Sequence, residues 1–138
     1  MTGYGWARFF CRVMLGLMFF MAGWFKCFHL TPLGHATRFF TGPYADTWIP
    51  RVLLLAAGMA IPVLELVAGA LLILGLRTRE ALVTLGLVLL LVTYGHLLKE
   101  PLFSITEHIL PRTALLVAAF LLPGAQDILS LDHWLEKK

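Results

Sequence analysis

Residues 51–76 read RVLLLAAGMAIPVLELVAGALLILGL, and the basic turn Arg77-Thr78-Arg79 follows directly. Between Arg51 and this turn the run carries a single ionisable residue, Glu65. As an α-helix the run rises about 1.5 Å per residue, which is enough to cross a hydrocarbon core of about 30 Å. The stretch therefore predicts a transmembrane helix with a carboxyl group inside it.

Three more apolar segments complete the predicted fold. A turn as short as residues 77–79 makes the segment after it antiparallel to residues 51–76. The last segment reaches spanning length only with Glu107, His108 and Arg112 inside it. We therefore predict an all-α integral membrane four-helix bundle, a single transmembrane domain over residues 1–138, with helices at about 6–26, 51–76, 80–98 and 103–122. The connection 27–50 is expected to lie along the membrane surface as a short interfacial helix and turn, and residues 123–138 form a C-terminal tail.

The composition agrees with a membrane location. Of the 138 residues, 59% are hydrophobic and 14% charged, whereas a soluble domain carries about a quarter charged residues. The net charge of +3 comes from basic residues scattered at the ends of apolar runs, a pattern that favours membrane orientation over nucleic acid binding. Cys11 and Cys27 lie on one predicted helix about 24 Å apart, so they cannot form a disulfide bond with each other.

The distribution of basic residues also predicts how the chain is oriented in the membrane. An even number of spans places both termini and the turn at residues 77–79 on one face. The basic residues are then Arg8, Arg77, Arg79, Lys137 and Lys138 on that face, against Lys26, Arg38, Arg51 and Lys99 on the other. Cytoplasmic loops carry the excess of Lys and Arg, so five against four favours cytoplasmic termini.

Charged side chains at membrane depth are candidates for a functional site, because an ionisable group in the hydrocarbon costs roughly 3 kcal/mol or more and needs a partner. Counted at about 1.5 Å per residue from the face that holds the termini, Arg12, Glu65 and Arg112 lie about 9 to 17 Å deep. We therefore predict that these three residues form one interior network.

One face of the first helix carries both charged and small residues. Positions three, four or seven apart share a helical face, and on this face lie Arg12, Gly16, Phe19, Gly23 and Lys26. The two glycines let a neighbouring helix approach closely. The closest helix contact is therefore expected on the side that carries the charges.

Two prolines accompany the charges. Pro62 lies one turn before Glu65 and leaves the carbonyl of Gly58 without its intrahelical donor, and Pro111 is expected to free a carbonyl beside Arg112 in the same way. Proline-disrupted helices at one depth are a feature of intramembrane binding sites.

These observations support two interpretations of the charged residues. In the first, Arg12, Glu65, Arg112 and Lys26 bind the polar head of a lipid-soluble molecule. In the second, they form a purely structural ion-pair network that sets the helix register.

A second polar layer is predicted nearer the other face, with His96 and His108 turned inward and Glu107 beside them. Histidine titrates near neutral pH, so these residues are candidate catalytic groups for proton relay. Two histidines on adjacent helices are also compatible with a haem or a metal ion, but helix spacing often produces such pairs. Interface histidines hydrogen-bonded to Glu107 are the simpler interpretation, and no metal site is predicted.

Three motifs resemble the DoxX family of small four-helix membrane proteins. They are Arg12-x3-Gly16-x6-Gly23-x2-Lys26, Glu65-x3-Gly69 running into Leu74-Gly75-Leu76-Arg77-Thr78-Arg79, and Ser130-Leu131-Asp132 after Pro123-Gly124. The resemblance implies a four-helix bundle in the cytoplasmic (inner) membrane of a bacterium or archaeon. It also implies membership of a group that includes a membrane subunit of thiosulfate:quinone oxidoreductase and the MauE-type proteins of amine dehydrogenase maturation. Other members of this group are linked to thiol and oxidative-stress systems.

Three functions follow as hypotheses. The first is a subunit of a quinone-linked oxidoreductase that works with a redox partner protein, because the chain has no CxxC, CxxCH or dinucleotide motif of its own. The second is a non-catalytic membrane scaffold or assembly subunit that docks a partner enzyme. The third is a small transporter or lipid-binding protein, because four helices can form a pathway when the chain assembles as a homo-oligomer.

Overall fold

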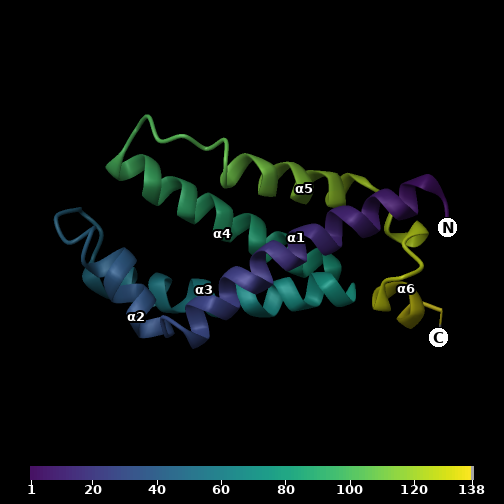
Figure 1. The fold of residues 1–138 in the computed structure, drawn as a ribbon, viewed down its shortest axis with the longest axis horizontal. Coiled ribbons are helices and arrows are strands. Elements are labelled where there is room, and N and C mark those ends of the chain that lie inside the picture. The colour runs from purple at the N-terminus through teal and green to yellow at the C-terminus, as the bar shows by residue number, and fades with distance from the viewer. Residues whose placement is uncertain (138) are drawn as a thin grey trace.

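The computed structural model describes residues 1–137, which are helical apart from turns and loops and contain no strand. Three long helices and a shorter one form a bundle, and short helical turns occupy the connections (Figure 1). In chain order the elements are α1 (Gly3–Phe28), α2 (Pro32–Ala36), the π-helical turn η1 (Thr37–Thr41), α3 (Arg51–Leu74), α4 (Thr78–Lys99), α5 (Ile109–Leu121), the 3₁₀ turn η2 (Gly124–Gln126) and α6 (Leu131–Leu135). The predicted all-α class is confirmed.

Three of the helices, α1, α3 and α4, are long and apolar enough to cross a membrane. They contain 26, 24 and 22 residues and rise about 39, 36 and 33 Å. Large apolar side chains such as Phe10, Leu87 and Leu90 lie exposed on the outside of the bundle, where a soluble protein rarely gathers so many. These helices match the predicted segments 6–26, 51–76 and 80–98 to within a few residues.

The fourth helix is shorter than predicted. α5 contains 13 residues and rises about 20 Å, and residues 103–108 before it are not helical. Pro111 therefore lies in the first turn of α5, where backbone N–H groups have no intrahelical partner in any case. The expectation that Pro111 frees a carbonyl inside a long helix is wrong for this reason.

α1 and α3 pack with their backbones in direct contact. A Cβ atom on Gly69 would lie 2.5 Å from the backbone nitrogen of Phe20, and one on Gly16 would lie 2.9 Å from the carbonyl oxygen of Gly69. Gly23 meets the backbone of Leu66 just as closely. The predicted close approach on the Gly16 and Gly23 face is confirmed. Around this contact α1, α3, α4 and α5 share a core that includes Leu15, Phe19, Ala68, Leu72, Leu82, Leu85 and Leu116.

The connection 27–50 contains a helix and a turn, as expected, and part of it packs against α3. In α2 the side chains of His35 and Ala36 are buried against α3. A Cβ atom on Gly58 would lie 2.6 Å from the Cα of Ala36, so only glycine allows this contact. Because Gly58 is seven residues into α3, α2 covers roughly the first 10 Å of that helix.

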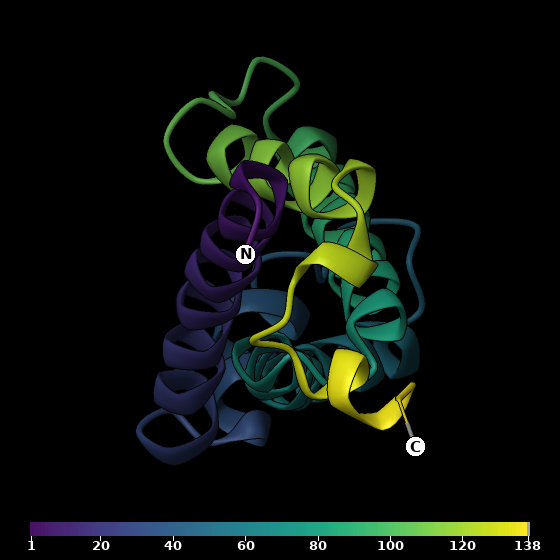
Figure 2. The same ribbon diagram turned by 90° about the vertical axis from the view of Figure 1, so that its right-hand side faces the viewer.

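Both termini lie at the same end of the molecule (Figure 1). Viewed from that end, the C-terminal tail crosses the bundle beside the turn between α3 and α4 (Figure 2). The backbone N–H of Asp132 donates to the carbonyl of Gly75 over 2.8 Å, and Gly75 holds the left-handed conformation that ends α3. The tail is therefore part of the packed structure.

Candidate functional site

An ion pair between Lys26 and Glu65 joins α1 to the middle of α3. The Lys26 Nζ lies 2.7 Å from Oε2 and 3.0 Å from Oε1 of Glu65. The Glu65 side chain is 6% exposed, whereas that of Lys26 is 27% exposed. The carboxylate is thus enclosed by the bundle, while part of the Lys26 side chain lies at its outer surface.

Local packing places this pair. Gly23 lies one turn before Lys26 and lets α1 approach α3 closely at Leu66. Side chains of an α-helix also point toward its N-terminus, so the ammonium of Lys26 lies deeper in the bundle than its position near the C-terminal end of α1 suggests. Both effects bring it onto the Glu65 carboxylate.

The ammonium group of Lys26 has one more N–H donor than the ion pair uses. An ammonium group has three N–H donors and no acceptor, and the hydrogen bonds of Lys26 within the described residues go to the two oxygens of Glu65. Water is scarce at this depth in a membrane. The third N–H thus has no acceptor among the described residues.

A histidine that the sequence analysis did not select lies in the neighbouring element α2. The Nδ1 of His35 lies 2.7 Å from the carbonyl oxygen of Gly58, the oxygen that Pro62 deprives of its intrahelical donor. Burial lowers the pKa of His35 below its ordinary value, although the hydrogen bond to Gly58 opposes that shift. Because a carbonyl oxygen only accepts, the Nδ1 of His35 is the donor in this hydrogen bond. The only sequence signal for this contact was the proline itself.

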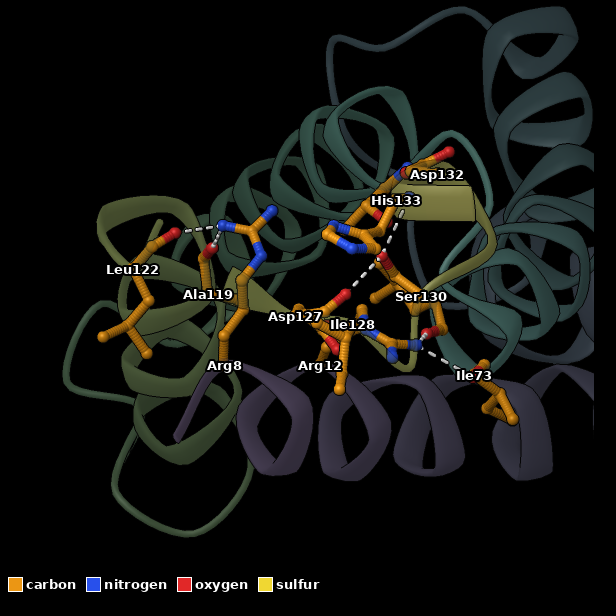
Figure 3. A network of polar contacts seen from close by, with 12 residues as sticks. Arg8, Arg12, Ile73, Ala119, Leu122, Asp127, Ile128, Ser130, Asp132 and His133 are labelled. Atoms are coloured by element: carbon orange, nitrogen blue, oxygen red, sulfur yellow. Dashed lines mark hydrogen bonds and ion pairs between the residues drawn. The ribbon is translucent and has the colours of Figure 1, made fainter. Parts of the chain in front are cut away.

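Arg12 is fully buried, but its partner is an aspartate of the C-terminal tail. Its Nε lies 2.9 Å from Oδ2 of Asp127, and both side chains are 0% exposed. Its Nη1 donates to the carbonyl of Ile73 over 2.9 Å and to that of Leu72 (Figure 3). These are among the last carbonyls of α3, which a cation stabilises.

Two further contacts, one of them made by the tail, cap helices at the same end. The Nη1 of Arg8 donates to the carbonyl of Ala119 at the end of α5 over 2.7 Å. The carboxylate of Asp132 accepts from the backbone N–H of Arg77 over 2.6 Å and from that of Thr78 over 2.8 Å, at the start of α4. This end of the bundle is a set of charged helix caps, a structural arrangement. The sequence feature that could have predicted these caps is the presence of carboxylates in the short tail after the last apolar segment.

The predicted network of Arg12, Glu65 and Arg112 is wrong. Arg112 lies in the first turn of α5, donates to the carbonyl of His108 over 2.5 Å, and has its guanidinium 5.7 Å from the ring centre of Phe19. Residues 103–108 do not continue the helix, so Arg112 lies at the start of α5 rather than inside a long span, and depth alone does not determine which neighbour a side chain faces. Glu65 and Arg12 are instead in separate ion pairs.

The predicted inward pair of histidines is also wrong. His96, Glu107 and His108 are all exposed, and the ring of His96 stacks on that of Phe103 at a centroid distance of 4.3 Å. No hydrogen bond joins either histidine to Glu107 among the described side chains. Within residues 1–137 no group of three or more His, Cys, Asp or Glu side chains is arranged to hold a metal ion.

Comparison with known proteins gives one match. Residues 4–100 match the family model described as methylamine utilisation protein MauE, a range that includes Lys26, His35 and Glu65 and ends before α5 and the tail. Neither the search of curated proteins nor that of solved structures found a match. The matched range covers more than half of the chain and all three helices of membrane length, so the chain is a membrane protein of the MauE family.

Proposed function

We propose that this protein is the membrane subunit of a redox system in the cytoplasmic membrane and that it binds a quinone, or a similar lipid-soluble carbonyl compound, at Lys26 and Glu65. The observation that supports this proposal most directly is the asymmetry of the pair. Glu65 is enclosed, while the Lys26 side chain is partly exposed and its ammonium group has one N–H donor beyond the two that bond Glu65.

The chemistry of a quinone head group suits that donor. A quinone carbonyl is a neutral acceptor that enters a membrane site from the lipid without the desolvation cost of an ion. The Lys26 N–H donates to this oxygen and stabilises the negative charge that develops on it during reduction, because charge–dipole interactions are strong in a water-poor site. Glu65 fixes the position of the Lys26 ammonium group through two hydrogen bonds.

The chain's own role is then to bind and orient the quinone. The conversion of a quinone to a quinol takes up two electrons and two protons, and the sequence contains no redox motif. We assign both the electrons and the protons to a redox partner protein. The family model that the chain matches is described as methylamine utilisation protein MauE. A purely structural pair is the alternative, and it does not require a spare N–H donor.

The test is the quinone content of the protein purified in mild detergent, measured by solvent extraction and chromatography, together with titration of added ubiquinone. Wild type is expected to retain quinone, and Lys26→Met and Glu65→Gln are expected to lose it while eluting as folded protein in size-exclusion chromatography. The matched control is Lys99→Met, because Lys99 makes an exposed ion pair with Asp46 over 2.8 Å. Absence of quinone from wild type, or equal binding by Lys26→Met, would refute the proposal.

A further inference from the structure

The connection between α4 and α5 returns into the thickness that α4 crosses before α5 begins. The caps described above show that the start of α4 and the end of α5 lie at the same end of the bundle. From that end α4 rises about 33 Å and α5 only about 20 Å, so α5 begins well short of the far end of α4 (Figure 1). Thr113 of α5 shares a groove with Thr93, which lies about 22 Å along α4. Non-helical backbone therefore lies at membrane depth.

This backbone has donors without partners. Within residues 1–137 the N–H groups of residues 104–108 form no hydrogen bond with the rest of the chain, and these residues are exposed. Irregular backbone at membrane depth occurs only where protein covers it or where it lines a water-filled cavity. The outer face of the segment therefore needs a cover that the chain itself does not supply.

Two charged side chains at the same place lack an ion-pair partner. Glu107 is exposed and Arg112 is half-buried, and neither forms an ion pair within the described part of the chain. The Arg112 guanidinium points back toward the start of α5, because its Nη1 donates to the carbonyl of His108. It thus lies at the depth of Glu107. A charge at membrane depth needs a partner, so both groups call for one from outside the chain.

An apolar groove continues this surface along the bundle. It has a volume of about 320 Å³, lies between α4 and α5, and extends along α5 from Thr113 to Phe120. Its walls include the exposed side chains of Leu87 and Leu90. The outer surface of α4 and α5 thus combines an apolar groove with a polar segment that carries one acid and one base.

From these observations we infer that this surface is the contact between two copies of the chain, in which Glu107 of each copy pairs with Arg112 of the other. Two copies with the same orientation in a membrane are related by a two-fold axis along the membrane normal, and rotation about this axis preserves depth. An isologous contact must be self-complementary. An acid and a base at one depth meet that requirement, whereas a partner of one charge sign would leave one of them unpaired.

This inference is independent of quinone binding, because Lys26 and Glu65 belong to α1 and α3. It also supplies the cover that residues 104–108 need, since the second copy presents the same hydroxyl and carbonyl acceptors at the same depth.

The experiment is chemical crosslinking in native membranes. Thr106→Cys, in a background with Cys11 and Cys27 replaced by serine, places a thiol next to Glu107 on the exposed segment. We expect a short membrane-permeant bis-maleimide to convert this variant to a dimer on denaturing electrophoresis. Glu136→Cys is the control in the tail at the other end of the bundle, and it is expected to remain monomeric. Absence of a dimer from Thr106→Cys, or a crosslink only to a different protein, would overturn the inference.

Charge reversal tests the pairing itself. Glu107→Arg places an arginine opposite Arg112 in both contacts, and Arg112→Glu places a glutamate opposite Glu107. Each is expected to lower the crosslinking yield of Thr106→Cys about tenfold, because like charges then meet. The exposed change Glu136→Arg is the matched control and should leave the yield unaltered.

Co-expression of the two reversed variants with different affinity tags restores both pairs. In protein recovered from the membrane fraction, we expect a crosslinked band that carries both tags, at the yield of the unreversed protein. Folding defects in the single variants would not produce such a rescue. Crosslinking that persists in both single variants, or that does not return on co-expression, would overturn the inference.

Discussion

The Nδ1 of His35 lies 2.7 Å from the carbonyl oxygen of Gly58, the acceptor that Pro62 leaves open in α3. A proline inside a transmembrane helix is tolerated when a neighbouring group satisfies the freed carbonyl. Here the neighbour is a side chain of the connection between α1 and α3. The proline therefore creates the docking point for α2, and the glycine at the same position makes room for it.

If this relationship holds α2 in place, His35→Ala should destabilise the protein by about 1–3 kcal/mol, because a buried acceptor loses its partner. In a Pro62→Ala background the helix supplies its own N–H to Gly58, so His35→Ala should then cost clearly less. Thermal unfolding of the four proteins in detergent measures this coupling. His29→Ala is the control at an exposed histidine. Simple additivity would show that His35 does not satisfy the carbonyl.

Stability should also depend on pH through His35. Its pKa in the folded protein is lowered by burial, below the ordinary value of about 6.5. The unfolded chain then binds more protons in that interval, so stability is fully present above about pH 6.5 and is lost as the pH falls through the folded pKa. His35→Asn keeps a donor for Gly58 but does not titrate, and it should flatten the pH profile of Tm below pH 6.5. If the pH profile of Tm of His35→Asn were identical to that of wild type, the loss of stability at low pH would come from other groups.

The Lys26 and Glu65 pair should be energetically coupled, whatever it binds. Glu65→Gln or Lys26→Met alone leaves a charge without its partner, and we expect a loss of about 3–5 kcal/mol from such a break. The double variant Lys26→Met with Glu65→Leu removes both charges and should recover most of that stability. Chemical unfolding in detergent micelles provides the comparison. If the double variant instead lost the sum of the two single losses in stability, Lys26 and Glu65 would not be energetically coupled.

Asp127 should anchor the tail through Arg12. Asp127→Ala leaves a buried guanidinium without its carboxylate, so the tail should open and the end of α3 should lose protection from hydrogen exchange at Leu72 to Gly75. Hydrogen–deuterium exchange with mass spectrometry reports both changes. Glu136→Ala, an exposed change in the same tail, is expected to leave exchange unaltered. Equal exchange in Asp127→Ala and wild type would mean that the salt bridge does not hold the tail.

The five basic residues on the face that holds the termini, against four on the other face, predict that both termini are cytoplasmic. A membrane-impermeant maleimide applied to intact cells should label Asp46→Cys and should not label Glu136→Cys, in a background with Cys11 and Cys27 replaced by serine. Labelling at position 136 and not at position 46 would show that the termini are extracytoplasmic, and it would leave the predicted bundle unchanged.

Much of the helical framework followed from residue patterns alone. Hydropathy over about 20 residues determines whether a segment enters a membrane, since transfer into hydrocarbon is a sum of local side-chain terms. For this reason the positions of α1, α3 and α4 could be predicted. The spacing of Gly16 and Gly23 also identified the contact face of α1, because helical periodicity is a local property.

The partners of the buried charges were decided by tertiary structure. The sequence required that Arg12 and Glu65 be paired, because an unpaired charge is costly in a membrane, but many pairings meet that requirement. The choice of Asp127 and Lys26 depends on helix rotation, on the side-chain direction of Lys26, and on a tail that folds back across the end of the bundle. These are long-range features with no periodic signal, and the same holds for the contact of His35 with Gly58. The sequence thus determined which groups needed partners, and only the packing of distant segments determined which partners they have.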